Sequence, residues 1–306
     1  MGKDRGMKPA PFQWHGPTDV EAAVAHLAEY GPQAKVLAGG QSLVPLLAMR
    51  LTQPAHVVDI NRVAALDTVL VDEDGVTIGS LARHTRVERD DRAFRAQPLL
   101  RQALRFVAHP TIRNRGTCVG SLVHADPAGE LTAVLAVCGG TVTARSATGT
   151  RTIPAADFFL APFTSALSAD ELAVGAHFPA RPARGGTAFV EIARRHGDYA
   201  LCGVAVVAEL DDAGEPARLR AGYLSVADVP LVLDLTDAWR AGPPEAAAVA
   251  RDGVDPVTDL HATAEYRRHL AGVLTIRAAR QAISAAVETA AGSNDPGVAG
   301  SRSGEQ

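Results

Sequence analysis

Residues 113–130 constrain the fold and function of this chain more than any other segment. The segment begins with the basic, amide-bearing run Arg113-Asn114-Arg115, passes the glycines Gly116 and Gly120, and ends in His-Ala-Asp-Pro before an apolar helical pattern. Glycine lets a backbone approach a bulky polar ligand because no Cβ intervenes. Hydroxyls and successive backbone N–H groups in such a loop can bind an anion. The segment alone therefore indicates either a phosphate-binding loop or an ordinary turn before a helix.

A second glycine-rich segment lies upstream, at Ala38-Gly39-Gly40-Gln41-Ser42. Residues 35–38 are typical of a short buried strand, Ser42 is a favourable N-cap, and Pro45 falls in the first turn of the helix that follows. A helix start of this kind presents free N–H groups to an anion. The segment is neither a P-loop nor a Rossmann fingerprint, since both of their glycine patterns are absent. Two separate anion loops in one chain favour a ligand with two phosphates, hence a dinucleotide.

Together and in this order, the two motifs resemble those of a known family. They are similar to the FAD-binding medium subunit of the molybdenum hydroxylases, which include carbon monoxide dehydrogenase and the xanthine dehydrogenase group. The likeness extends from about Phe12 to about Ala291. The residues that carry it, besides the first loop, are Asn114, Gly116, Thr117, Gly120, Ser121, Leu122, His124, Ala125, Asp126, Pro127 and Glu130.

The resemblance implies an α+β fold with two domains. A two-lobed FAD-binding domain of the PCMH type is expected over residues 7–180, with lobes over about 7–60 and 61–180. A C-terminal domain like that of the carbon monoxide dehydrogenase flavoprotein, an antiparallel sheet with helices, is expected over 187–291. Prolines, arginines and glycines cluster at 179–186, as they do in linkers, and mark the boundary.

Local patterns predict the individual elements. The capping box Thr18-Asp19-Val20-Glu21 precedes a helix that ends at Gly31. An apolar periodicity over 262–290 predicts a long final helix. Residues 292–306 are rich in Gly, Ser, Asn, Asp and Pro and are predicted to form a disordered tail. The remaining predictions are strands at 35–38, 56–60, 76–79, 141–145, 151–153, 171–178, 201–210 and 217–226, and helices at 99–107 and 128–137.

Composition and charge exclude several classes of protein. The net charge of −4 argues against a nucleic-acid partner. No apolar run approaches the roughly 18 residues that suggest a membrane span, and the N-terminus lacks the apolar core of a secretory signal. Cys118, Cys138 and Cys202 are far apart and odd in number, which indicates reduced thiols in a cytoplasmic protein. No metal or iron–sulfur site is predicted, because Cys-x-x-Cys is absent and His124-x-Asp126 lacks a third ligand.

The resemblance assigns the two pyrophosphate loops residue by residue. The first comprises Ala38, Gly39, Gly40, Gln41 and Ser42, and the second Thr117, Cys118, Val119, Gly120 and Ser121. The structural alternative is a helix cap for the first loop and an ordinary turn before a helix for the second. Val119 departs from the family, which usually has glycine there. Valine fits this position only if its φ stays negative, because a left-handed conformation strains a β-branched residue.

The same resemblance implies four further contacts with the cofactor. His124 and Glu130 lie beside it, Leu167 contacts the flavin, and Tyr199 lies over the isoalloxazine ring. The alternatives for the first three are a hydrogen-bonded structural histidine, a solvated helix face and plain core. Asp126 is as well suited to capping the following helix as to touching a ligand. Tyrosine suits a flat flavin because its face is apolar while its hydroxyl stays wet.

The implied function is electron transfer through non-covalently bound FAD, which joins one-electron clusters to a two-electron acceptor. In the family, a large molybdopterin subunit oxidises the substrate and a small [2Fe–2S] subunit relays electrons. The flavin subunit passes them to NAD, a quinone or oxygen, and a dimer of heterotrimers is the expected assembly. Two alternatives remain. One is a free-standing FAD oxidoreductase with His196 as base. The other is a non-enzymatic flavin scaffold, which Val119 and the absence of the usual lysine before Arg194 would favour.

Overall fold

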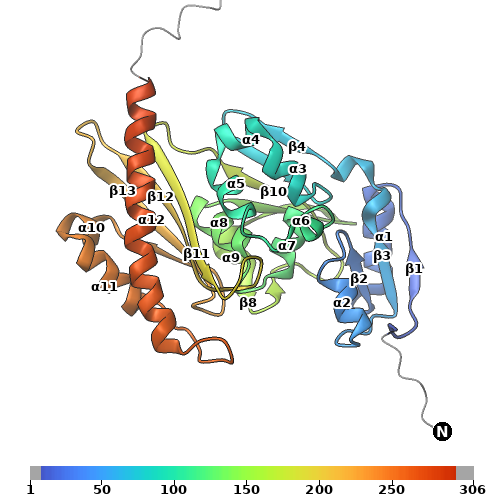
Figure 1. The fold of residues 1–306 in the computed structure, drawn as a ribbon. Helices are drawn as coiled ribbons and strands as arrows, with labels where there is room; N and C mark the ends of the chain where they lie inside the picture. Colours follow the sequence, from blue (N-terminus) through green and yellow to red (C-terminus); the bar gives the residue numbers. More distant parts are fainter. Residues whose placement is uncertain (1–7, 294–306) are drawn as a thin grey trace, which may run out of the picture.

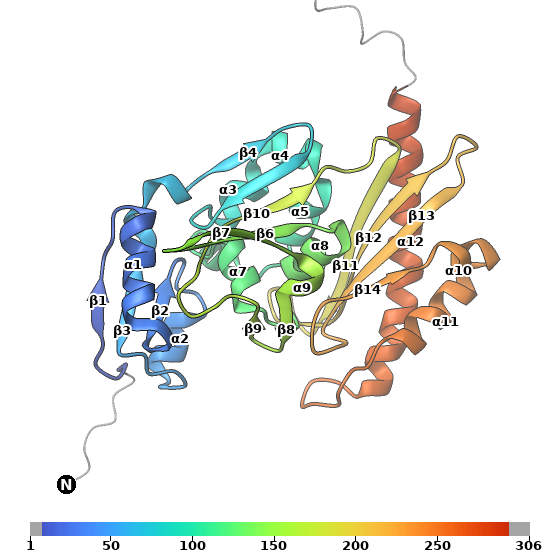
Figure 2. The same ribbon diagram turned by 180° about the vertical axis from the view of Figure 1, so that it is seen from behind.

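The computed structural model describes residues 8–293, which form three parts along the sequence (Figure 1). A small N-terminal lobe is followed by a middle part built on a five-stranded sheet, and then by a four-stranded sheet that a long helix covers. Seen from behind, the middle part lies between the other two (Figure 2). This mixture of helices and sheets confirms the predicted α+β fold. Residues 294–306 of the predicted tail lie outside the described residues.

The N-terminal lobe contains three short strands, β1 (Gln13–His15), β2 (Ala34–Leu37) and β3 (His56–Asp59). They pair in parallel in the order β1-β3-β2. Strands β2 and β3 confirm two predictions, whereas β1 is too short to show an alternation in the sequence. Two helices complete the lobe, α1 (Val20–Tyr30) and α2 (Leu43–Ala48).

The start of α1 differs from its prediction. A capping box would place Thr18 at the N-cap, but Asp19 takes that position, and its Oδ1 accepts the N–H of Ala22 at 2.7 Å. A carboxylate makes a stronger charge-assisted bond than a hydroxyl, which favours the start one residue later. Gly31 ends the helix as predicted, with φ of 48°.

The middle part contains five antiparallel strands, β4 (Val69–Val71), β5 (Gly75–Gly79), β6 (Thr141–Ser146), β7 (Gly149–Pro154) and β10 (Leu172–Pro179), in the order β4-β5-β10-β6-β7. The predicted strands at 76–79, 141–145, 151–153 and 171–178 are confirmed. A two-stranded hairpin, β8 (Phe159–Ala161) and β9 (Thr164–Ser165), stands beside this sheet. The helices are α3 (His84–Arg89), α4 (Asp91–Ala96), α5 (Pro98–Leu104), α6 (Pro110–Arg113), α7 (Cys118–His124), α8 (Glu130–Cys138) and α9 (Ala155–Phe158).

The C-terminal part is an antiparallel sheet in chain order, made of β11 (Gly185–Ala193), β12 (Ala200–Leu210), β13 (Pro216–Leu224) and β14 (Leu231–Asp234). Helices α10 (Thr236–Ala241), α11 (Pro243–Gly253) and α12 (Ala264–Ser293) follow. The predicted strands at 201–210 and 217–226 and the long final helix are confirmed. No helix within residues 8–293 is both long and apolar enough to cross a membrane.

Alternation along β11 separates the two faces of this sheet. Ala188 and Val190 belong to a core shared with Leu274 and Ala278 of α12. Phe189 instead belongs to the core of the middle part, with Leu100 of α5 and Leu135 of α8 among its members. Side chains of a strand point alternately to opposite faces. Helices α5 and α8 are therefore packed between the five-stranded and four-stranded sheets, which joins these two parts through one core.

Candidate functional site

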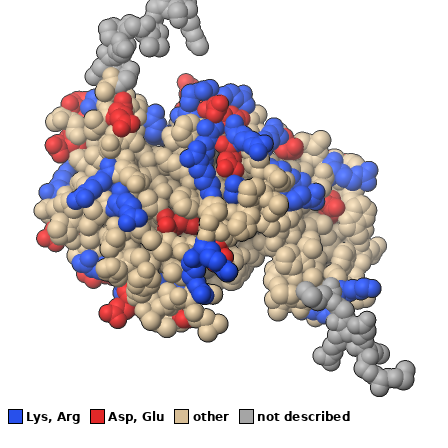
Figure 3. All heavy atoms as spheres, viewed as in Figure 1, with Lys and Arg blue, Asp and Glu red and all other residues tan. Residues whose placement is uncertain are grey.

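The two glycine-rich segments meet in space. Gly39 follows β2, and a Cβ built on it would lie 2.5 Å from the carbonyl oxygen of Arg115 and 2.8 Å from the Cα of Gly116. Only a residue without a side chain permits such an approach of two backbones. Figure 3 shows the surface hollowed between the N-terminal lobe and the rest of the molecule. The contact at Gly39 thus joins the first loop to the second across the boundary between two parts of the fold.

A hydrogen-bonded network fixes this contact. The Asn61 amide donates to the carbonyl of Ala38 at 2.8 Å and to Asp59 Oδ1 at 2.7 Å. The guanidinium of Arg83 donates to Asn61 Oδ1 at 2.7 Å and to the carbonyl of Arg115 at 3.1 Å. Burial first, and then the charge of Arg115, lowers the pKa of Arg83. The guanidinium remains charged, so it brings a positive charge to the place where the loops meet.

The sequence analysis missed Asn61 and Arg83. A signal existed for Asn61, because it comes two residues after the buried strand β3, and the carboxyl ends of parallel strands are where α/β folds place ligands. Arg83 carries no local signal. It precedes α3, and its partners lie far from it in the sequence.

The first loop adopts a conformation that requires glycine at one position. Gly40 has φ of 74°, a left-handed backbone that other residues rarely take. The amide of Gln41 donates to the carbonyl of Gly39 at 3.0 Å, which closes the loop. Ser42 stands at the N-cap of α2, but its side chain makes no capping hydrogen bond. The serine hydroxyl is therefore available to a ligand, contrary to the capping role that the sequence suggests.

The second segment is a helix start and not a loop. Thr117 is the N-cap of α7, and its Oγ1 accepts the N–H of Gly120 at 3.1 Å. Cys118 and Val119 are buried in the core, which holds this first turn in place. Val119 lies inside the helix, where φ is negative, so valine replaces glycine there without backbone strain. The change at Val119 thus gives no support to a lost binding site.

Ser121 is held from the neighbouring helix. His84 at the start of α3 lies 3.0 Å from Ser121 Oγ through its Nε2. Burial lowers the pKa of His84 to about 4, so this imidazole is neutral at physiological pH. A neutral ring can accept from the hydroxyl or donate to it. The hydroxyl of Ser121 is therefore oriented by a buried residue that the sequence analysis also missed.

The far end of α7 carries the next two candidates. The ring of His124 lies 5.2 Å from that of Phe163, whose backbone N–H donates to the carbonyl of Ala125 at 2.9 Å. Asp126 does not cap α8, because Gly129 is the N-cap, and its carboxylate accepts the N–H of Ala128 at 2.9 Å. Leu167 is half-buried and packs against the core of the middle part. That position is compatible with the core alternative for Leu167.

Glu130 and Tyr199 gather with Asp126 beyond the end of α7. Burial raises the pKa of Glu130 to about 7, and the charge of Asp126 adds to this. Desolvation of its hydroxyl is the main cause that raises the pKa of Tyr199, and the charges of Asp126 and Glu130 raise it further. Tyr199 as a whole residue is nevertheless 73% exposed. An exposed aromatic face beside a group of carboxyls is suited to cover a flat polar ring.

Helix α7 links the two groups of candidates. Its N-terminal end lies at the paired loops, and its C-terminal end reaches His124 and the turn with Asp126 (Figure 1). A helix of 7 residues is about 10 Å long. No hydrogen bond or ring contact among the described residues joins Tyr199 directly to Gly39 or Gly40. An extended ligand would therefore have to run along α7 to touch both groups.

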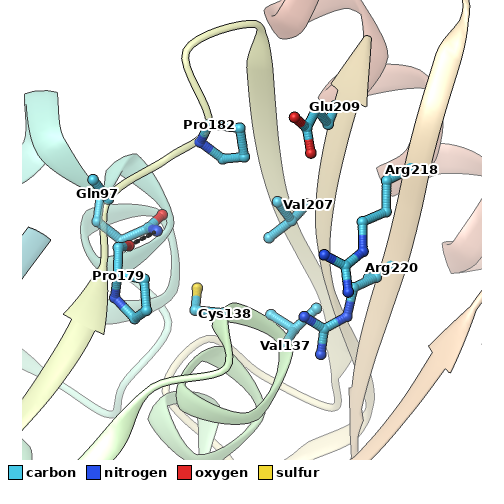
Figure 4. A pocket seen from close by; sticks show the side chains of 10 residues that line it. Gln97, Val137, Cys138, Pro179, Pro182, Val207, Glu209, Arg218 and Arg220 are labelled. Carbon is cyan, nitrogen blue, oxygen red and sulfur yellow. Dashed lines mark hydrogen bonds between the residues drawn. The ribbon is translucent and has the colours of Figure 1, made fainter. Parts of the chain in front are cut away.

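Two hollows lie elsewhere. One, of about 100 Å³, sits at the other end of α8, where the guanidiniums of Arg218 and Arg220 point inward near Cys138 (Figure 4). The other, of about 440 Å³, is an open basin on α3 to α6 lined by Arg89, Arg105 and Asn114, among others. Among the described residues, no group of three His, Cys, Asp or Glu could hold a metal ion.

Comparison with known proteins explains this arrangement. Residues 10–181 match the family model of the FAD binding domain in molybdopterin dehydrogenase. The chain belongs to this family. Residues 187–282 match the carbon monoxide dehydrogenase flavoprotein C-terminal domain. The resemblance drawn from the loop motifs is thereby confirmed, and FAD is the cofactor of the domain that carries those motifs.

Relatives in this family align over nearly the whole chain. The 6-hydroxypseudooxynicotine dehydrogenase complex subunit alpha of Paenarthrobacter nicotinovorans is 38% identical, over 92% of this chain and 98% of the relative. The carbon monoxide dehydrogenase medium chain of Hydrogenophaga pseudoflava is 32% identical, over 89% and 97%. The solved quinoline 2-oxidoreductase of Pseudomonas putida 86 superposes with a TM-score of 0.85 at 31% identity, over 91% and 99%. This chain is thus an oxidoreductase-family subunit of medium-chain type.

Proposed function

We propose that this chain is the FAD-carrying electron-transfer subunit of a molybdenum hydroxylase complex. It takes electrons from the [2Fe–2S] clusters of a partner subunit and passes them through FAD to NAD, a quinone or oxygen. The observation that carries the proposal is the contact of Gly39 with Arg115 and Gly116. It brings together two glycine segments of a family FAD domain at one end of α7, while the charges of Asp126 and Glu130, beyond the other end of α7, act on the exposed Tyr199.

The residues present suit FAD. Gly39, Gly40, Gln41 and Ser42 would hold one side of the pyrophosphate, and Thr117 to Ser121 the other, with the charge of Arg83 nearby. Tyr199 would cover the ring, and Glu130 and His124 would line its approach. When bound, FAD supplies a group that accepts two electrons and releases them singly or as a pair. The chain's own residues bind and orient it and keep water from the ring face.

The attachment is proposed to be non-covalent. Cys118 is the thiol within the second glycine-rich segment, but it is fully buried, and burial raises its pKa. The thiolate is the reactive form of cysteine, so this side chain is inert. His124, the histidine near the same segment, has its ring against that of Phe163.

The clusters and the molybdenum cofactor are proposed to lie on partner subunits, a small [2Fe–2S] subunit and a large molybdopterin subunit. The three cysteines of this chain are free and separate, and none is exposed. The names of several relatives describe medium chains or subunits of complexes. We infer a dimer of heterotrimers in the cytoplasm as the working assembly.

Anaerobic reduction tests this function. The FAD-loaded chain alone should keep its yellow colour with any small substrate other than a reduced acceptor such as NADH or a quinol. Bleaching should begin only when both partner subunits and their substrate are present. Bleaching of the isolated chain by a small substrate would indicate the free-standing oxidoreductase, with the exposed His196 as its candidate base. Flavin that stays yellow in the complete complex with its substrate would indicate a non-enzymatic flavin-binding scaffold.

A further inference from the structure

The β11–β12 loop, residues 194–199, carries Tyr199, which is proposed to cover the flavin ring. Its polar side-chain contacts stay within the C-terminal part of the molecule. Arg195 makes an ion pair inside the loop, with its Nε 3.1 Å from a carboxylate oxygen, and Arg194 Nη1 lies 3.5 Å from His261 Nδ1. Among residues 8–293, no hydrogen bond or ion pair joins this loop to the middle part. Other contacts must therefore fix the loop against the middle part.

His109 of the middle part makes those contacts. A Cβ built on Gly197 would lie 2.5 Å from Cε1 of the His109 ring and 2.8 Å from both Nδ1 and Nε2. Nearly equal distances to three adjacent ring atoms place this position over the face of the imidazole and not at its edge. The ring of His196 approaches the same imidazole at 65°, with the two centroids 6.1 Å apart. Gly197 also has φ of 86°, so both its backbone and its contact with the ring require glycine.

The backbone that carries His109 is held firmly. Ala108 has φ of 43°, a left-handed conformation that is uncommon for a residue with a side chain. The guanidinium of the buried Arg113 donates to the carbonyls of Val107 and Ala108 at 3.0 and 3.2 Å. The carbonyl of His109 accepts the N–H groups of Ile112 and Arg113 at 2.9 and 3.0 Å, and α6 begins at the next residue. The imidazole of His109 therefore projects from a fixed backbone.

Helix α6 connects this backbone to the second glycine-rich segment. The N–H of Gly116 donates to the carbonyl of Ile112 at 2.7 Å, which closes the turn directly after α6. Gly116 is also the residue that Gly39 of the first loop approaches. One short helix thus joins the place where the pyrophosphate is proposed to bind to the ring against which the loop of Tyr199 packs.

We propose that His109 is a positioning residue for Tyr199: the face of its ring holds Gly197, and with it the β11–β12 loop, where Tyr199 covers the flavin. This inference rests on the proposed place of Tyr199 beside FAD. The imidazole of His109 makes no hydrogen bond among the described residues, so it holds the loop by the flat shape of its ring. Losing a ring contact of this kind changes an equilibrium constant by about 2- to 13-fold.

Limited digestion of the apoprotein with trypsin tests the hold on the loop without FAD. Arg194 and Arg195 are exposed, so the rate of cleavage after them reports how often the loop leaves its place. His109→Ala should be cleaved there about 2- to 13-fold faster than wild type. His109→Phe keeps a flat ring and should be cleaved at the wild-type rate. So should His269→Ala, which removes an exposed histidine of α12.

The bound flavin reports on Tyr199 itself. In FAD-loaded His109→Ala, flavin fluorescence should rise and reoxidation by oxygen should become faster, as in Tyr199→Ala. The dissociation constant of FAD should rise by no more than about 13-fold, because the pyrophosphate contacts remain. Combining His109→Ala with Tyr199→Ala should change fluorescence no further than Tyr199→Ala alone, because the two residues act through one contact. His109→Phe should keep the wild-type fluorescence.

Gly197→Ala perturbs the same contact from the side of the loop. Its methyl would meet the His109 ring at 2.5 Å, so cleavage and flavin fluorescence should rise as they do in His109→Ala. Gly214→Ala is the matched control, because Gly214 has φ of 85° but a Cβ there would meet nothing within 4 Å. The control carries the same backbone strain and should leave both readouts unchanged. If His109→Ala fails to fold by circular dichroism, Gly197→Ala carries the test, since it leaves α6 intact.

Wild-type cleavage in a folded His109→Ala or in Gly197→Ala would overturn the proposal. Fluorescence changes of His109→Ala and Tyr199→Ala that add in the double variant would also overturn it, because the two residues would then act separately. Faster cleavage in His109→Ala together with unchanged fluorescence in Tyr199→Ala would confirm the hold on the loop and contradict the proposed place of Tyr199. Wild-type protein that binds no FAD would contradict the proposed function instead.

Discussion

Gly39→Ala should separate the two glycine-rich segments. The added methyl would lie 2.5 Å from the carbonyl oxygen of Arg115 and 2.8 Å from the Cα of Gly116, whereas ordinary contacts begin at 3.4 Å. The backbones must therefore move apart by about 0.9 Å, the difference between 3.4 and 2.5 Å. Both neighbours are backbone atoms, so no side chain can rotate away to make room.

The expected cost follows from overpacking and from the network beside the contact. Forcing a methyl into a packed site costs about 1–3 kcal/mol. A shift of this size also stretches the hydrogen bonds of Asn61 and Arg83 that join the same two segments. If FAD must draw the segments together again, the cost falls on its binding. An energy of 1–3 kcal/mol corresponds to FAD affinity about 5- to 150-fold weaker.

The assay is a titration of FAD into the apoprotein, with thermal unfolding as a check on the fold. Gly149→Ala is the matched control, because Gly149 is the exposed first residue of β7, directly after the β6–β7 turn, and a Cβ there would meet nothing within 4 Å. The control should bind FAD as wild type does. If Gly39→Ala binds FAD normally and unfolds at the wild-type temperature, the two segments are not in contact, and the site described here is wrong.

Four further predictions follow from the same geometry. Gly40→Asp should fold but lose FAD, because it adds a negative charge and a left-handed aspartate where the pyrophosphate approaches. Normal flavin content in this variant would show that the first loop serves only as a helix cap. Tyr199→Ala should weaken FAD binding by no more than about 0.5–1.5 kcal/mol while raising flavin fluorescence and speeding reoxidation by oxygen; unchanged fluorescence and reoxidation would place Tyr199 away from the ring. The pKa of Glu191 is about 8 in the folded chain against 4.5 in the unfolded chain, so its contribution to the free energy of unfolding is complete below pH 4.5 and is lost as the pH rises toward 8. In urea titrations Glu191→Gln should therefore remove a slope of at most about 1.4 kcal/mol per pH unit from the free energy of unfolding. An unchanged slope would show that Glu191 is already ionised. Acid precipitation should release the yellow colour into the supernatant, whereas colour in the pellet would indicate a covalent link.

Much of the fold was predictable because its signals are local. The hairpin between β12 and β13 follows from Asp211 to Glu215, and Asp211 does accept the N–H groups of Ala213 and Glu215. Gly139 ends α8 in a left-handed conformation with φ of 69°. The helix predicted at 99–107 is shorter than expected, since α5 ends at Leu104 and Ala108 has φ of 43°.

The parts that could not be predicted depend on contacts between distant segments. Residues 117–121 look like a loop because Gly116 precedes them and Gly120 lies among them, yet burial of Cys118 and Val119 turns them into the start of α7. Arg83 and His84 act on the site only because the fold brings the start of α3 beside α7 and beside Asn61, which holds the first loop. Burial, and then the charge of Glu130, raises the pKa of Glu191 in the same way, because the fold brings together a strand and a helix that the sequence separates.

The flavin content of the purified chain tests the central claim most directly. Protein is unfolded in acid after purification with FAD and removal of the excess, and the FAD released is compared with the amount of chain. The account predicts one FAD per chain for wild type and for Gly149→Ala, and much less for Gly40→Asp. A colourless wild-type protein that takes up no FAD, or equal flavin in wild type and Gly40→Asp, would contradict it.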